Sequence, residues 1–102
     1  MLSWLSSTRC VKFAEDLATE LTGLVPSDKN LSEAKRLSKS NYAKEKLVKK
    51  IQAFKQEEIL NFYKTAKLLN TFKWALKDAG YDATFIDGFA AWVFLKLRET
   101  KT

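Results

Sequence analysis

Histidine is absent from the 102 residues of this chain, and cysteine and proline each occur once. Without histidine the chain lacks the commonest general base and metal-binding side chain of proteins. The single cysteine, Cys10, cannot form an internal disulfide or a thiolate cluster around zinc, and it has no histidine beside it to activate it as a nucleophile. We therefore expect a protein that is not an enzyme, with no catalytic residues, no cofactor and no metal site.

A long apolar run is also missing, since no stretch reaches the roughly 18 to 20 apolar residues that cross a bilayer. The apolar start Met1–Ser7 lacks the cationic beginning, the long apolar core and the small-residue cleavage site of a secretory signal. With one free cysteine and no such signal, the sequence predicts a cytoplasmic protein.

Glycine and proline are so few that the 53 residues from Ser27 to Ala79 contain neither. No segment alternates apolar and polar residues over the length of a strand, and the abundant Ala, Leu, Lys and Glu favour helices. Hydrophobic residues make up 46% of the chain, which is enough for one core at this length. We expect a single all-α domain over residues 1–102.

Apolar residues spaced three and four apart predict where the helices lie. The first helix is expected to end at Gly23 and Pro26, which do not continue a helix. Breaks are expected at Ser38–Asn41, where cap-forming residues interrupt the apolar phase, and near Gln56–Glu58. The expected apolar faces run through Cys10, Phe13, Ala14, Leu17, Ala18, Leu21 and Val25; through a short set of Leu31, Ala34 and Leu37; through Ala43, Leu47, Ile51 and Phe54; and through Phe62, Ala66, Leu69, Phe72 and Leu76.

The last helix is expected over Ala83–Glu99, capped by Asp82 and preceded by a stop at Gly80. Eight of the nine residues in Phe89–Leu97 are apolar. A helix that is apolar all round is usually buried all round, so we place this helix in the centre. The expected fold is all-α, a compact antiparallel bundle of four longer helices plus one short helix.

Positive charge is concentrated in the middle of the sequence. The chain carries a net charge of +6, whereas residues 29–77 alone hold 13 basic and 4 acidic residues, a net of +9. A stripe of lysines on one helix suits sequence-independent binding to nucleic-acid phosphates or contact with an anionic membrane, although such a stripe is more often only a solvated face. If this region were one helix, the stripe would consist of Lys35, Lys39, Lys46, Lys49 and Lys50.

Aromatic residues form a second candidate site, after Glu58. Tyr63, Lys67, Asn70 and Trp74 follow one another at spacings of four, three and four, which places them on one helix face. Because Trp and Tyr supply much of the energy of protein interfaces, this strip favours binding to a partner. The competing interpretation is that both faces of this helix lie in the core.

The apolar start Met1–Leu5, which contains Trp4, is a third candidate. Such a segment docks on a partner or a lipid interface, or it packs back on the first helical turn as a hydrophobic staple. The staple is the commoner arrangement.

One segment carries a resemblance. Asn70–Asp82 (NTFKWALKDAGYD), together with a start of the type Met-Leu-x-Trp-Leu, resembles small bacterial all-helical proteins that carry no assigned function. The resemblance covers less than half of the chain; it implies a cytoplasmic bacterial protein and adds no active-site residue.

The sequence thus supports two functional hypotheses of different classes. The first is a protein-interaction module, including one that binds a second copy of itself, which uses Tyr63, Lys67, Asn70 and Trp74. The second is sequence-independent nucleic-acid binding through the lysine stripe. A peripheral contact with an anionic membrane ranks below both.

Overall fold

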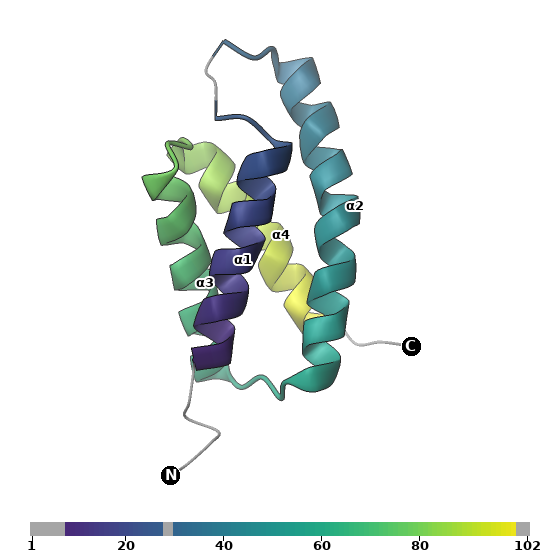
Figure 1. Ribbon diagram of the computed structural model, residues 1–102, viewed down its shortest axis with the longest axis vertical. Helices are drawn as coiled ribbons and strands as arrows, with labels where there is room; N and C mark the ends of the chain where they lie inside the picture. The colour runs from purple at the N-terminus through teal and green to yellow at the C-terminus, as the bar shows by residue number, and fades with distance from the viewer. Residues whose placement is uncertain (1–7, 28–29, 100–102) are drawn as a thin grey trace.

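The computed structural model describes residues 8–27 and 30–99, which form four helices (Figure 1). Helix α1 spans Thr8–Leu24, α2 spans Glu33–Glu57, α3 spans Phe62–Asp78 and α4 spans Ala83–Arg98. The prediction of an all-helical fold is confirmed for this part of the chain. None of these helices combines the length and the apolar character that crossing a membrane requires. The apolar start Met1–Leu5 lies outside the described residues.

The helices alternate in direction along the chain. α1 and α3 run one way, and α2 and α4 run the other way (Figure 1). α1 packs against α2 and α3, and α4 packs against the same two helices on the other side; the most extensive contact joins the parallel neighbours α1 and α3. The connection from α2 to α3 therefore crosses one end of the molecule, beside the start of α1 (Figure 1).

Capping residues explain where three of the helices begin. The side chains of Ser32, Asn61 and Asp82 each accept a hydrogen bond from the backbone N–H three residues later, which satisfies a donor that has no partner within the helix. The predicted cap at Asp82 is confirmed. The predicted end of the helix at Gly80 is also confirmed. Gly80 has a φ of 98°, and this left-handed conformation favours glycine.

The predicted break at Ser38–Asn41 is wrong. α2 continues without interruption through these residues, and the short helix expected around Leu31, Ala34 and Leu37 does not exist as a separate element. The physical reason is that Ser and Asn lower helix stability by only about half a kcal/mol each. That is less than what α2 gains by packing its next turns on α1 and α4, so the helix continues.

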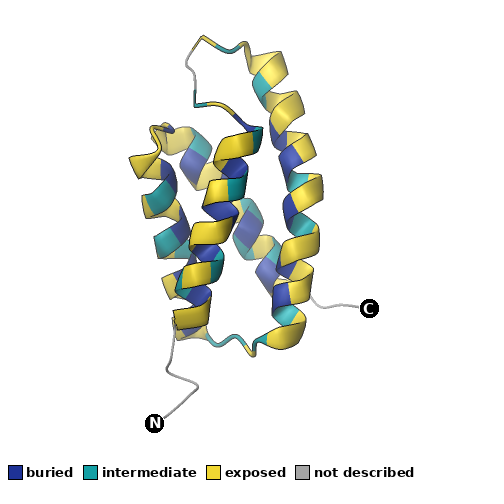
Figure 2. Cartoon of the chain, in the orientation of Figure 1, coloured by how far each residue is buried: buried dark blue, intermediate teal, exposed yellow. Residues whose placement is uncertain are grey.

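Buried residues lie on the inward sides of the four helices (Figure 2). The expected faces of the first helix and of the second half of α2 are confirmed, except that Phe13 is only half-buried and stacks on Phe54, with ring centroids 4.1 Å apart. The core consists of Cys10, Ala14, Leu17, Ala18, Leu21, Val25, Ala43, Leu47, Ile51, Phe54, Leu68, Phe72, Leu76, Tyr81, Ile86, Phe89, Ala90, Val93 and Leu97.

The placement of α4 in the centre is wrong. Ala91 and Leu95 are exposed, and Trp92 and Phe94 are only half-buried. The outer aromatic rings are covered by cations instead of by another helix: the Lys44 ammonium lies 5.7 Å from the centroid of Trp92, and the Arg98 guanidinium lies 5.5 Å from that of Phe94. An apolar helix such as α4 can therefore lie at the surface, because cations cover its outer aromatic rings.

The predicted apolar face of α3 is partly wrong. Phe62 and Ala66 are exposed, and the buried line consists of Lys64, Leu68, Phe72 and Leu76. Because Glu58 neutralises the Lys64 ammonium, a lysine takes an inward position and the buried line is rotated away from Phe62.

A hydrogen bond joins the turn between α3 and α4 to the residues that follow α1. The buried Tyr81 hydroxyl donates to the backbone carbonyl of Val25, just after α1, and the Tyr81 ring stacks on Phe85. Burial raises the pKa of the Tyr81 phenol, an effect that the charge of Arg36 partly opposes. This contact fixes the turn between α3 and α4 against the end of α1.

Candidate protein-interaction surface

The outward face of α3 brings together the four residues of the predicted aromatic strip. Tyr63, Lys67, Asn70 and Trp74 are all exposed, with 51% of Tyr63 and 60% of Trp74 accessible to solvent. At about 100° per residue they lie within about 60° of one another and about 150° from the buried line of the same helix. The competing interpretation, that both faces of this helix lie in the core, is therefore wrong for α3.

Trp74 stands as a ridge between two grooves. One groove, of about 390 Å³, lies between α3 and the start of α4 and is also lined by Tyr81 and Ile86. The other, of about 470 Å³, lies between α3 and α1 and is also lined by Val11. Trp74 and Asn70 line both grooves. A partner segment that lies across α3 would thus meet an aromatic ridge with a depression on each side.

Charged side chains hold the surroundings of Trp74 in place. The Lys77 ammonium lies 4.9 Å from the centroid of the Trp74 ring, within range of a cation–π interaction. Lys73, one residue before Trp74, forms an ion pair with Asp87 of α4 at 3.4 Å. The Lys77 contact leaves the Trp74 ring exposed, and the ion pair of Lys73 ties the neighbouring residue of α3 to α4.

The lysine stripe lies on a single helix, because α2 is unbroken. All five of its lysines are exposed, and Lys35, Lys39, Lys46 and Lys50 fall within about 60° of a common line. Two of the five make contacts of their own: Lys50 forms an ion pair with Glu20 of α1, and the Lys46 ammonium lies 5.3 Å from the centroid of the Tyr42 ring. The condition for the nucleic-acid hypothesis, one continuous helix, is met.

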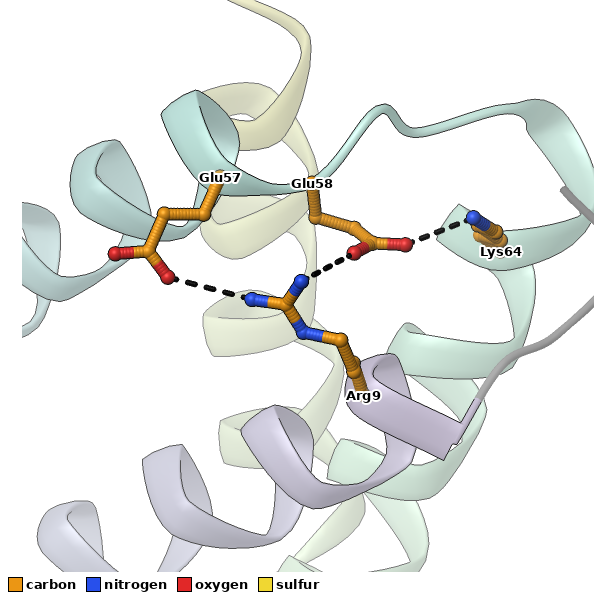
Figure 3. Close-up of polar contacts among 4 residues, drawn as sticks. All are labelled: Arg9, Glu57, Glu58 and Lys64. Atoms are coloured by element: carbon orange, nitrogen blue, oxygen red, sulfur yellow. Dashed lines mark hydrogen bonds and ion pairs between the residues drawn. The ribbon is translucent and has the colours of Figure 1, made fainter. Parts of the chain in front are cut away.

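A group of ionic contacts at the start of α1 is not evident from the sequence (Figure 3). The Arg9 guanidinium lies between two carboxylates, 3.3 Å from Glu57 and 3.2 Å from Glu58. The second oxygen of Glu58 accepts a hydrogen bond from the Lys64 ammonium at 2.7 Å, and both of these side chains are largely buried. Glu57 and Glu58 are adjacent in the sequence, but their shared partner Arg9 lies 48 residues before Glu57, beyond the reach of helical spacing.

Cys10 lies beside these contacts and has no solvent exposure. Burial raises the pKa of its thiol, and the negative charge of Glu58 raises it further, while Lys64 and Arg9 act in the opposite direction. A buried thiol that stays protonated is a poor nucleophile. The geometry assigns Cys10 to the core.

The fold and its surfaces define a small all-α protein with an exposed aromatic face on α3 and an exposed lysine face on α2. Comparisons with protein-family models, with curated proteins and with solved structures find no match to this chain. Its function is therefore inferred from its own surface.

Proposed function

We propose that this chain is a cytoplasmic, non-enzymatic protein-interaction module that binds a partner protein, or a second copy of itself, through the outward face of α3. The observation that supports the proposal is the exposure of Trp74 on the side opposite the core, between two grooves. A Trp ring offers a large apolar area that loses little conformational freedom on binding, and Trp and Tyr are enriched among the residues that dominate interface energies.

The polar residues of the strip suit the same role. Lys67 and Asn70 stand between Tyr63 and Trp74 and supply hydrogen-bond donors beside the rings. Interfaces combine such a core of aromatic anchors with polar groups that set orientation. The strip from Tyr63 to Trp74 covers about 16 Å of helix, at 1.5 Å per residue, which is the scale of three turns docking on a partner.

Replacing Trp74 with alanine is expected to weaken binding strongly while leaving the fold intact. Truncation of an interface anchor weakens binding by about 30-fold or more, whereas an exposed side chain contributes within about 0.5 kcal/mol to folding. We would compare sedimentation velocity and quantitative affinity capture for the unmodified chain and Trp74→Ala. The matched control is Leu95→Ala, because Leu95 is exposed to the same extent on α4. Equal oligomerisation and an equal set of captured proteins for all three chains would contradict the proposal.

The alternative, sequence-independent nucleic-acid binding through the lysine stripe, is favoured by the continuity of α2. For a short DNA duplex, contacts from five lysines are expected to lose about 500-fold in affinity between 50 and 200 mM salt, because each contact releases counterions. The double variant Lys46→Gln/Lys49→Gln should reduce the logarithmic salt slope by about 2. Fluorescence anisotropy measures both. Absence of binding at 50 mM salt, or affinity that does not change with salt, would reject this alternative.

A further inference from the structure

Two bulky apolar side chains project from the end of the molecule where α2 passes into α3. Ile59 is 89% exposed and Phe62 is 91% exposed, which makes them the most exposed of the large apolar side chains in the described residues. Neither belongs to the outward strip of α3, and neither is used by the proposed function. Their exposure therefore needs a separate explanation.

The connection that carries them is held in place on both sides. The Glu58 backbone N–H donates to the Phe54 carbonyl at the end of α2, and the Asn61 side chain accepts a hydrogen bond from the Lys64 N–H at the start of α3. Between them, Leu60 is half-buried against the core. The fold thus packs Leu60 against the core and leaves its neighbours Ile59 and Phe62 exposed.

The end of the molecule that carries these two residues has a net positive charge. α1 begins, α2 ends, α3 begins and α4 ends at this end of the molecule (Figure 1). The carboxylates at this end of the described residues are Glu57, Glu58 and Glu99, and all three are ion-paired. Glu57 and Glu58 pair with Arg9, Glu58 pairs also with Lys64, and Glu99 pairs with Lys96. The six helical residues of each helix nearest this end, with the connection and Glu99, hold seven cations, Arg9, Lys12, Lys55, Lys64, Lys67, Lys96 and Arg98, against three anions, Glu57, Glu58 and Glu99.

The opposite end has the reverse balance. There the corresponding six residues of each helix, with the connection from α3 to α4, hold four cations, Lys35, Arg36, Lys73 and Lys77, against five anions, Glu20, Glu33, Asp78, Asp82 and Asp87. In the described residues the net charge is therefore +4 at the end that displays Ile59 and Phe62 and −1 at the other. The molecule is polarised along its length, with apolar side chains at the positive end.

We propose that this end of the molecule docks on an anionic lipid bilayer, with Ile59 and Phe62 inserted at the level of the headgroups. Apolar side chains that project singly from a positively charged end match the bilayer interface, where apolar groups reach the acyl boundary and basic groups meet anionic headgroups. A protein partner would instead need a pocket of matching shape for each projecting side chain. Each Lys or Arg near an anionic surface strengthens binding by about fivefold.

Vesicle co-sedimentation of the full chain tests the proposal. Vesicles of phosphatidylcholine with 30% phosphatidylserine are expected to bind the chain at 50 mM salt, and vesicles of phosphatidylcholine alone are expected to bind it far less. The variant Ile59→Ser/Phe62→Ser should lose at least about tenfold in lipid partitioning, since two large apolar side chains no longer leave water. All variants are checked for helical circular dichroism. Failure of the unmodified chain to bind phosphatidylserine vesicles would overturn the proposal.

Two matched controls separate this end from the other surfaces. Leu37→Ser/Tyr42→Ser removes two exposed apolar side chains from α2, towards the negative end, and Trp74→Ala removes the anchor of the proposed protein interface. Both should bind vesicles as the unmodified chain does. If Ile59→Ser/Phe62→Ser binds vesicles as strongly as these controls, binding comes from lysines alone and the proposal fails. If that variant changes only the oligomeric state, the patch is a protein contact and the proposal also fails.

A fluorophore at position 59 reports insertion directly. Cys10 has no solvent exposure, so an environment-sensitive maleimide dye is expected to label Ile59→Cys selectively in the folded chain. Its emission should shift to the blue on phosphatidylserine vesicles, whereas the same dye on Leu37→Cys should not shift. Unchanged emission at position 59 on vesicles that bind the chain would overturn the insertion of this end.

Discussion

Replacing Glu58 with alanine is expected to destabilise the fold by about 3–5 kcal/mol, because it leaves a buried ammonium without a countercharge. The Lys64 side chain is only 6% exposed, and its ammonium lies 2.7 Å from Glu58. In the unfolded chain that ammonium is hydrated, so the whole cost falls on the folded state. Urea unfolding, followed by circular dichroism, measures the change in the free energy of unfolding.

The two partners of this ion pair are not equivalent, and this makes the prediction specific. Glu58 also contacts Arg9 at 3.2 Å, so Lys64→Met leaves the carboxylate with a countercharge and should cost less than Glu58→Ala. In the double variant Glu58→Leu/Lys64→Met both charges are replaced by apolar side chains, and the stability should return close to that of the unmodified chain, since an apolar replacement of a buried pair is often neutral. Equal losses for the two single variants would contradict this account.

Phe72→Ala is expected to cost about 3–5 kcal/mol, because it opens a cavity in the middle of the core. Phe72 has no solvent exposure and is the largest fully buried side chain of the described residues; its ring centroid lies 6.2 Å from that of Phe89 on α4. A loss of this size is a large part of the roughly 5–15 kcal/mol that stabilises an average domain. Urea unfolding should show a lower midpoint with an unchanged slope.

Phe62→Ala is the matched control, since Phe62 is the same residue type on the same helix but is almost fully exposed. It should change the free energy of unfolding by within about 0.5 kcal/mol. The comparison isolates mainly the effect of burial, because both variants remove the same ring from the same helix. If Phe62→Ala were as destabilising as Phe72→Ala, the assignment of the α3 faces would be wrong.

The helical class was predictable because its signals are local. The spacing of Ala14, Leu17 and Leu21 identifies the inner face of α1 without knowledge of its neighbours, and the structure buries all three. Asp82 and Gly80 mark helix ends through hydrogen bonds and dihedral angles that involve a few consecutive residues. The same spacing places Tyr63 and Trp74 on one face of α3.

The errors arose where the outcome depends on the strength of distant contacts. Ser38–Asn41 resembles a break because its residues cap helices well, yet packing of later turns of α2 keeps the helix continuous. The apolar run of α4 suggested a central position, but Lys44 and Arg98 cover its outer rings. The packing that keeps α2 continuous and the contact of Lys44 with α4 join different helices, so neither follows from the order of residues within one segment. The contact of Arg98 with Phe94, four residues earlier on the same helix, is local.

The amino-acid sequence alone therefore determined that this chain is helical, where most helices begin and end, and which residues share a face. Only the tertiary structure decided which of those faces meets another helix and which meets solvent. Phe62 and Phe72 show the difference: both fit one apolar phase, but Glu58 neutralises Lys64, the buried line of α3 passes through Lys64, and Phe62 is left outside. Helical periodicity acts within one helix, whereas the contacts that cover a face join different segments, such as Glu58 after α2 and Lys64 on α3. That is why the exposure of Trp74, Ile59 and Phe62, on which the functional proposals depend, required the folded chain.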